Sequence, residues 1–467
     1  MYEFLEYVLS ELRTSLGLVC VAGMAALAVL AVIYAVHKKK FGGERKFPWG
    51  KAVLWVMFIG YCAIVLYATI LRGTGGYREW NLHLFRAWRE AWNNFSAKNW
   101  ANVLLNVAMF APLGFLLPLL AKKLRKWYLC IPAGFAVSLG IELIQLAIGR
   151  GICDVDDLFA NTLGAAIGYF AVMTILSITE KRRKSSLAYG ALALASVMAI
   201  CSIFIMYEMK AYGNLPEAAA YTNNTKGTAW ILDCRLPAVE EKLPIYRTQT
   251  RSLAECDAFA NEFKEIVGTE YTTISYYQEA AYYMDQAGDE NGTHFLFLSY
   301  LDPGYEYHCG YGDNPVWADA DRKTIEAALT DLPLFIPEYA AFTTEGEGWH
   351  SFTVDQHIDG AVMVDGTLRC RYAEDGTIRA IENDLLSYTY HDTQAVISPQ
   401  EAYARLCAGE FYDRGYFEHK NPAEVNVVSC IRGYEIDTKG FYQPVFYFDV
   451  ASSDGSYADR IMIPAMK

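Results

Sequence analysis

Residues 149–168, GRGICDVDDLFANTLGAAIG, place one arginine and three aspartates between two long apolar runs. Clustered carboxylates are groups that perform general acid–base chemistry or bind a divalent cation. The spacing of Asp154, Asp156 and Asp157 matches no standard cation-binding loop, and no histidine, serine elbow or nucleophilic cysteine motif accompanies them. Carboxylates also bind amine or hydroxyl groups, and Arg150 suits a phosphate or carboxylate. The stretch therefore predicts a polar binding site or an acid–base site.

The neighbouring apolar runs carry further polar residues at helical spacing. Asn102 and Asn106 are four apart, and Glu142 and Gln145 are three apart, so each pair shares a helix face. Asn161 lies in the first turns of the next run. A glutamate at mid-depth costs about 2.5–3.5 kcal/mol on insertion scales, so such a residue usually faces a bundle interior or a wet cavity. We expect these residues to face a shared hollow.

Structural roles compete with this interpretation. Asparagine and glutamine in membrane helices often only join helices through hydrogen bonds. Asp157 is suited to cap the helix that follows it, and Gly164 and Gly168 form a small-xxx-small pair typical of close helix packing. For Glu142 we expect Arg150 or Arg72 as the charge partner.

We expect these residues to lie on membrane helices. A helix that crosses a membrane needs about 20 apolar residues, and a sheet with an open edge would leave backbone groups unpaired in lipid. Residues 1–210 carry a net charge of +10, and residues 211–467 carry −23. The acidic second part argues against nucleic acid as a partner. Six apolar stretches predict spans at about 15–36, 52–71, 101–121, 128–148, 158–178 and 187–207.

The basic residues predict the orientation of the spans. The loops after the first, third and fifth spans read HKKKFGGERKF, KKLRK and EKRRK, and lysine and arginine mark the cytoplasmic side. We therefore expect a multi-pass protein of the cell membrane whose N-terminus and acidic C-terminal part lie outside. The polar residues named above then gather at the outer leaflet. The first 14 residues lack the pattern of a signal peptide.

Residues 52–180 resemble the VanZ-like family. The resemblance rests on the asparagines of the third span followed by Pro112 and Gly114, the Glu/Gln pair of the fourth, the charged loop, and the Asn/Gly pattern of the fifth. The stretches TILRG (69–73) and NLHLF (81–85) resemble the segment that leads into this region in the family. The resemblance implies a role in low-level teicoplanin resistance of Gram-positive bacteria. By resemblance, the site residues are Asn102, Asn106, Glu142, Gln145, Arg150, Asp154, Asp157 and Asn161, and the helix-packing residues are Pro112, Gly114, Gly164 and Gly168.

The C-terminal half predicts an exported α+β domain with an antiparallel sheet. A polar linker at 211–225 precedes a domain at 226–467, which we divide into 226–350 and 351–467. Helices are expected at 252–267, at 320–332 and from Ser398, whose neighbours Pro399 and Glu401 form a capping signature. Asp-Gly turns are expected at 365–366 and 375–376, with strands at 293–300, 425–435, 442–450 and 458–463, whereas 271–284 is ambiguous. The tail is loosely similar to PepSY-type exported modules.

The cysteines and histidines predict neither a cofactor nor a metal site. The exported half has six cysteines, which permit disulfides or remain free thiols, and no CxxC or HxxxH pair suggests zinc. The six are Cys234, Cys256, Cys309, Cys370, Cys407 and Cys430.

Three functions fit the sequence. The first is an outward-facing polar pocket that binds an amphipathic ligand: a membrane lipid, a lipid-linked envelope precursor or an acylated glycopeptide. The second is a membrane enzyme that acts on a lipid or lipid-linked glycan through its carboxylates, which leaves open whether the protein is an enzyme. The third is a sensor or scaffold whose exported domain binds an envelope protein.

Overall fold

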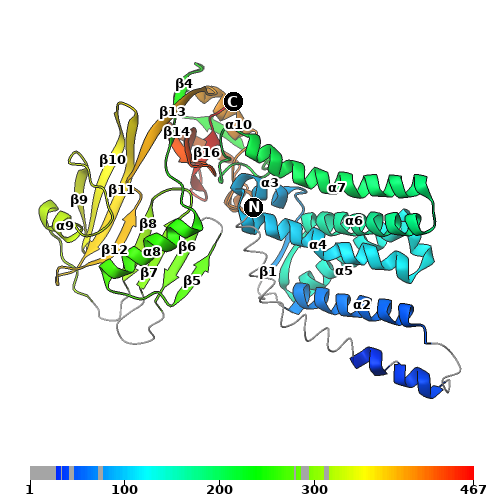
Figure 1. Ribbon diagram of the computed structural model, residues 1–467. Helices are drawn as coiled ribbons and strands as arrows, with labels where there is room; N and C mark the ends of the chain where they lie inside the picture. The colour runs from blue at the N-terminus through cyan, green and yellow to red at the C-terminus, as the bar shows by residue number, and fades with distance from the viewer. Residues whose placement is uncertain are drawn as a thin grey trace. The chain divides into compact units, whose positions relative to one another are not determined.

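The computed structural model describes residues 28–32, 34–40, 47–71, 77–277, 280–285, 294–309 and 315–467 (Figure 1). The chain divides into two compact units. We call the unit made of residues 1–92 and 97–210 the membrane unit, and the unit made of 93–96 and 211–467 the C-terminal unit.

The membrane unit is a bundle of apolar helices. Five described helices are long and apolar enough to cross a membrane, which confirms the helical class predicted for this half. The first predicted span, 15–36, lies largely outside the described residues, although 28–32 and 34–40 are helical. The five helices are α2 (Trp49–Leu66, extended by the π-helical turn η1, Tyr67–Leu71), α4 (Ala97–Leu120), α5 (Trp127–Ile148), α6 (Val155–Thr179) and α7 (Arg183–Met209).

Helices α4 and α6 form the closest pair because glycines let their backbones meet. A Cβ on Gly164 would lie 2.0 Å from the carbonyl oxygen of Val107, and a Cβ on Gly168 would lie 1.9 Å from that of Ala111. From the other helix, a Cβ on Gly114 would lie 1.8 Å from the carbonyl oxygen of Ala165. The two helices can therefore come this close only because glycine, which has no side chain, occupies these positions.

Short elements close one end of this bundle. The strand β1 (Tyr77–Asn81) precedes the helix α3 (Arg86–Asn94), and the strand β2 (Arg150–Asp154) joins α5 to α6. At the other end of the bundle, the 3₁₀ turn η2 (Lys122–Arg125) joins α4 to α5.

The C-terminal unit is an α+β structure built on one large, mostly antiparallel sheet, as predicted. Its main strand order is β3-β14-β15-β4-β13-β11-β12-β8-β7-β6-β5, with β16 beside β15, β10 beside β11, and β9 beside β10. The parallel pair is β3 with β14. The strands are β3 (Ala229–Leu232), β4 (Lys242–Arg247), β5 (Thr273–Tyr276), β6 (Ala280–Met284), β7 (His294–Ser299), β8 (Tyr305–Cys309), β9 (Ala341–Gly346), β10 (Trp349–Asp359), β11 (Val362–Tyr372), β12 (Ile378–Asn383), β13 (Leu386–Ala395), β14 (Glu424–Ile436), β15 (Phe441–Ser452) and β16 (Ala458–Pro464).

Two hydrophobic cores lie on this sheet. The helix α8 (Leu253–Val267) buries Cys256, Ala260 and Phe263 from one face against strands β6–β8 and β10–β12 (Figure 1). The helices α10 (Pro399–Cys407) and α11 (Tyr416–Lys420) pack with β14–β16 in the second core. The boundary expected at 350–351 falls inside β10, because β9–β12 contribute to the same core as α8.

Local signals predicted several of these elements. Ser398 Oγ accepts a hydrogen bond from the amide of Glu401 at 3.1 Å, and the strands predicted after 424 are present. The ambiguous stretch 271–284 forms the hairpin strands β5 and β6. The helix expected at 320–332 is the shorter α9 (Arg322–Ala328).

One predicted turn is wrong. Asp365 and Gly366 lie inside β11, whereas the Asp-Gly pair at 375–376 does turn between β11 and β12. Before Gly366, β11 pairs with β13, and after it the strand pairs with β12. Gly366 has φ +109°, and a Cβ there would lie 2.0 Å from the carbonyl oxygen of Asp384. The glycine therefore allows a kink where the strand changes partner.

Candidate functional site

The candidate site is built where β1 and β2 meet the ends of α5 and α6. The two strands run parallel, with Asn81 opposite Asp154. Helix α5 ends at Gly149, whose φ of +67° is the left-handed cap that glycine favours. The chain then forms β2 and enters α6 at once, so the charged loop is held close to the preceding helix.

Asp154 organises this junction. One carboxylate oxygen caps α6 by accepting a hydrogen bond from the amide of Asp156 at 2.8 Å. The other accepts one from Nδ2 of Asn81 at 2.9 Å. The cap of α6 is therefore Asp154, and Asp157, which was considered for that role, lies in the first turn.

Asp156 connects this loop to α3. Its side chain is 2% exposed, and its two oxygens accept hydrogen bonds from the amides of Phe85 and Ala87 at 2.5 and 2.6 Å. These amides lie at the start of α3, where a helix favours an anion. Phe85 has φ +68°, so the carboxylate stabilises a tight entry into the helix.

Glu142 and Asp157 each retain one carboxylate oxygen with no hydrogen bond in the described part of the chain. Glu142 is 3% exposed, and its Oε2 accepts from the amide of Asp154 at 3.2 Å. Asp157 Oδ1 accepts from Nδ2 of Asn106 at 2.5 Å, which joins α6 to α4. Glu142, Asp154, Asp157 and Asn106 thus belong to one polar cluster.

Asn161 lies one turn below Asp157 on α6. It is 3% exposed, and its Nδ2 donates to Oγ of the fully buried Ser138 at 2.9 Å. Its Oδ1 is buried without a hydrogen-bond partner. A buried acceptor of this kind costs about 1–3 kcal/mol when it stays unpaired, so this position is suited to a further donor.

Two predicted site residues, Gln145 and Asn102, lie apart from this arrangement. Gln145 donates from Nε2 to the carbonyl oxygen of Thr69 at 2.9 Å, in the π-helical turn that ends α2. This hydrogen bond joins α5 to the end of α2. Asn102 is exposed, one turn from Asn106. The side chain of Arg150 and all of Arg72 lie outside the described part of the structure, so the charge partner expected for Glu142 stays a prediction.

Sequence reasoning missed three contributors. Asn81 contacts Asp154, Ser138 contacts Asn161, and Asp156 holds α3, yet none was among the predicted site residues. Asn81 begins NLHLF, the stretch that already carried part of the family resemblance. Ser138 lies four residues before Glu142, so the helical repeat places it on the same face of α5.

The cluster is acidic. Among the ion pairs between described side chains, none involves Glu142, Asp154, Asp156 or Asp157. No group of three histidine, cysteine, aspartate or glutamate side chains in the described residues is placed to hold a metal ion. The arrangement is therefore suited to accept hydrogen bonds from amine, hydroxyl or amide groups.

The basic turns lie at the other end of the bundle. The Arg125 side chain in η2 pairs with Glu180 at the end of α6, with 3.0 Å between Nη1 and Oε1. Glu180 also pairs with Arg182 at 2.7 Å. The two ends of the bundle therefore differ in charge, with basic turns at one end and carboxylates at the other.

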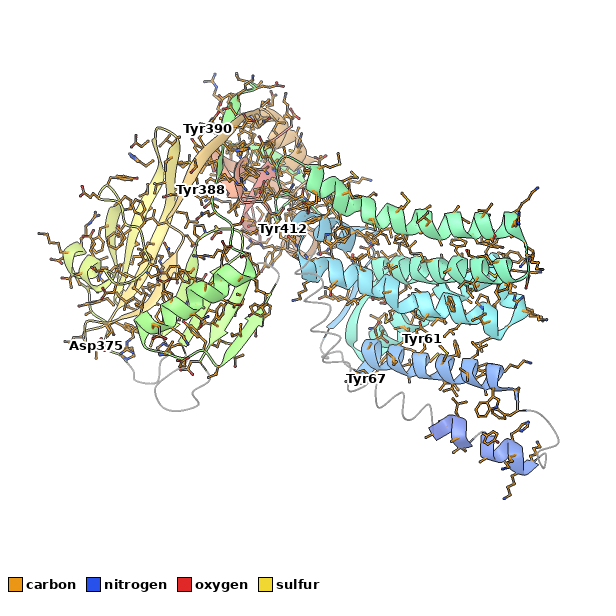
Figure 2. The ribbon with its side chains drawn as sticks, in the orientation of Figure 1. Tyr61, Tyr67, Asp375, Tyr388, Tyr390 and Tyr412 are labelled. Carbon is orange, nitrogen blue, oxygen red and sulfur yellow. The ribbon has the colours of Figure 1, made fainter. Side chains whose placement is uncertain are left out.

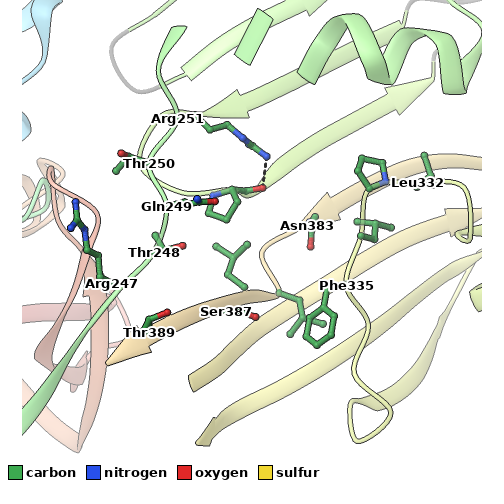
Figure 3. Close-up of a pocket in the computed structure, with 15 residues that line it drawn as sticks. Arg247, Thr248, Gln249, Thr250, Arg251, Leu332, Phe335, Asn383, Ser387 and Thr389 are labelled. Carbon is green, nitrogen blue, oxygen red and sulfur yellow. Dashed lines mark hydrogen bonds between the residues drawn. The ribbon is translucent and has the colours of Figure 1, made fainter. Parts of the chain in front are cut away.

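A second candidate site is a cleft of about 880 Å³ in the C-terminal unit (Figure 3). It lies between residues 247–251, the loop 332–335 and the junction of β12 and β13 at 383–389. Thr248 and Asn383 line it, each 6% exposed, and Thr248 Oγ1 and Asn383 Oδ1 are buried without partners. Arg251 donates to the carbonyl oxygens of Gly304 and Pro303. The cleft is therefore lined by both polar and apolar side chains.

Residues 52–177 match the VanZ/LLP1 family model. The match covers α2 to α6, and every member of the polar cluster lies within this VanZ/LLP1 segment. This segment is therefore similar to the VanZ/LLP1 family, and the five long apolar helices indicate a multi-pass membrane protein.

The other comparisons give less information about this chain. No curated protein matches the chain. Among solved structures, the Bacillus megaterium YpeB C-terminal domain matches at 11% sequence identity and a TM-score of 0.14, covering 47% of this chain and 99% of that one.

Proposed function

We propose that the VanZ/LLP1 segment binds an amphipathic cell-envelope molecule at the outer leaflet and so protects the cell against acylated glycopeptides of the teicoplanin type. The observation that supports this is the polar cluster of Asn106, Glu142, Asp154, Asp157 and Asn161 at one end of a bundle that is otherwise apolar. Acceptors that stay unpaired in such surroundings are rare and usually functional.

The ligand's chemistry follows from the groups in the cluster. The open oxygens of Glu142 and Asp157 accept hydrogen bonds from an amine or hydroxyl, and Oδ1 of Asn161 accepts from an amide or hydroxyl. Apolar side chains surround the cluster, with Leu143 and Ile144 exposed on the surface of α5. A polar head in the cluster and an acyl chain along the helices would satisfy both surfaces. The ligand is therefore a lipid, a lipid-linked precursor or an acylated glycopeptide.

The orientation follows from the basic turns. Lysine and arginine favour the cytoplasmic side, and η2 and the α6–α7 turn carry them at the end opposite the cluster. The cluster then faces outward, where envelope precursors and glycopeptides meet the membrane.

Glu142→Gln tests the proposal in a glycopeptide-sensitive host. Glutamine keeps the acceptor for the amide of Asp154 but removes the charge, so the fold should persist while recognition of an amine is lost. We expect the variant to lose most of the teicoplanin protection given by the wild-type protein, at equal protein level in the membrane. Protection against an unacylated glycopeptide should be small for both.

Glu180→Gln is the matched control, because it changes the same residue type at the opposite end of α6. It should protect as the wild type does. If Glu142→Gln and wild type protect equally, the cluster does not bind the ligand and serves only to join helices.

The cleft of the C-terminal unit supports a second function, in which this unit senses an envelope partner and the helices anchor it. The size of the cleft, about 880 Å³, and its lining of both polar and apolar side chains are the specific observation in its favour. Deleting residues 215–467 separates the two proposals. Protection that survives the deletion makes the C-terminal unit an accessory, whereas protection that disappears while the shortened protein still inserts favours the sensor.

A further inference from the structure

A cysteine of the C-terminal unit lies among basic side chains at one end of three neighbouring strands. Cys309 ends β8, and its direct partner across the strand pair is His294, the first described residue of β7. On the other side of β8, β12 contributes Arg379, next to Ala380, which is paired with His308. The three side chains come from separate strands, so the sheet determines their spacing.

The distances permit two hydrogen bonds to the sulfur. Nε2 of His294 lies 3.7 Å from Sγ of Cys309, and Nη1 of Arg379 donates to the same sulfur at 3.5 Å. Nδ1 of His294 lies 2.9 Å from the hydroxyl of Tyr307, which orients the imidazole ring. Cys309 and His294 are both half-buried.

The charges around this group favour the thiolate. The hydrogen bond from His294 and the one from Arg379 lower the pKa of Cys309 against the opposing effect of burial. The same bond raises the pKa of His294, with a further rise from Asp285 and a decrease from Arg379. Asp375, labelled in Figure 2, pairs with Arg379 at 2.9 Å. His294 on one side and Arg379 on the other therefore both favour the thiolate form of Cys309.

The other cysteines of this unit have different surroundings. Burial raises the pKa of Cys370 and of Cys430 to about 12, and raises those of Cys234 and Cys407. Cys256 is fully buried under α8. All six are free thiols in the described residues. Only Cys309 among them has two basic side chains within hydrogen-bond reach of its sulfur, as far as the described part of the chain extends.

We propose that Cys309 is a nucleophilic thiolate and the site at which the C-terminal unit is modified by thiol–disulfide exchange. The thiolate sulfur attacks one sulfur of a disulfide, a new S–S bond forms to Cys309, and the other half of the disulfide leaves as its thiolate. No net oxidant is needed, because the incoming disulfide is reduced as Cys309 is oxidised. His294 and Arg379 act by stabilising the attacking thiolate.

The test uses the full chain in detergent and the small disulfide 4,4′-dithiodipyridine. The protein is exposed to the reagent for short times between pH 5 and pH 9, and modification of each cysteine is measured by mass spectrometry of its peptide. At pH 6 we expect Cys309 to react at least about tenfold faster than Cys407 or Cys430, because their thiols are almost fully protonated there. Equal rates at pH 6 would overturn the proposal, with no variant required.

His294→Gln and Arg379→Gln test the cause. Each should move the midpoint of the pH–rate curve of Cys309 upward and slow its reaction at pH 6 by about threefold per unit of pKa, since a more basic thiolate is also a stronger nucleophile. Arg379→Lys, which keeps the charge, should restore part of the rate. His419→Gln, at an exposed histidine of α11, is the control and should change nothing.

If His294 and Arg379 have only a structural role, the experiment gives a different result. Cys256 and Cys370 are buried, so they report on folding and should stay unreactive in every variant. An unchanged midpoint in both variants, with these two cysteines still protected, would show that the basic side chains do not activate Cys309.

Discussion

At the scale of single residues, four neighbouring carboxylates have different roles because their oxygens have different partners. Both oxygens of Asp154 and both of Asp156 are occupied by amide donors of the protein. Glu142 and Asp157 each use one. Residue type alone does not show which two carboxylates keep an open oxygen, because all four are acidic and lie close together in the fold.

A carboxylate of the C-terminal unit gives a prediction at this scale. Loss of hydration raises the pKa of Asp384 to about 6, and the charges of Asp302, Glu306 and Glu382 add to the rise. Between pH 4 and pH 6 the folded state then binds more protons than the unfolded state, so stability falls as the pH rises. The free energy of unfolding of Asp384→Asn should therefore rise by about 1 kcal/mol relative to wild type between pH 4.5 and pH 7.5, a figure reduced because the residue is exposed to solvent.

Chemical unfolding of the full chain at the two pH values measures this difference. Asp392→Asn is the control of opposite sign, because the amide of Thr393 and the side chain of Gln394 lower the pKa of Asp392. A gain for Asp384→Asn that is the same at both pH values would contradict the assignment.

At the scale of elements, close approach determines how the helices pair. The sequence pattern at Gly164 and Gly168 indicated packing, and the structure identifies Val107 and Ala111 of α4 as the facing backbone. Figure 2 marks Tyr61 on α2, whose hydroxyl donates to the carbonyl oxygen of Met109 at 2.9 Å and so joins a third helix to α4. These contacts place α4 between α2 and α6.

Gly164→Ala should separate α4 from α6. The added methyl would lie 2.0 Å from the carbonyl oxygen of Val107, and overpacking of this kind costs about 1–3 kcal/mol. We expect a lower thermal midpoint in detergent. Gly140→Ala in α5 meets no atom within 4 Å, so it should be neutral or raise the midpoint through the better helix propensity of alanine. Equal midpoints for the two variants would show that the helices adjust freely.

At the scale of the whole molecule, charge separates the two halves. The net charge is +10 over residues 1–210 and −23 over 211–467. The basic residues of the first half lie mainly in turns between spans, which favours an outward-facing C-terminal unit.

The orientation can be measured with inserted epitope tags. A tag after Lys467 should bind antibody on intact cells, because the C-terminal unit is expected outside. A tag after Lys184, in the α6–α7 region, should bind only after the cells are permeabilised. The reverse pattern would invert the membrane unit and place the polar cluster on the cytoplasmic side.

The amino-acid sequence alone determined the elements whose cause is local. Apolar length predicted α2 and the four helices α4 to α7, and a cap signature predicted the start of α10 at Ser398. Fold class, family resemblance and most strands of the tail also follow from patterns within a short stretch, because hydrophobic periodicity and capping act between near neighbours.

Only the tertiary structure decided which polar groups meet. It placed Asn81 beside Asp154 and gave Asp156 to α3, contacts that join residues about 70 positions apart. It also showed that Asp365 and Gly366 kink a strand, because the carbonyl oxygen of Asp384 lies against the glycine. The same holds for Cys309, whose basic neighbours come from other strands. Such contacts depend on how distant elements pack, and no spacing along the chain contains that information.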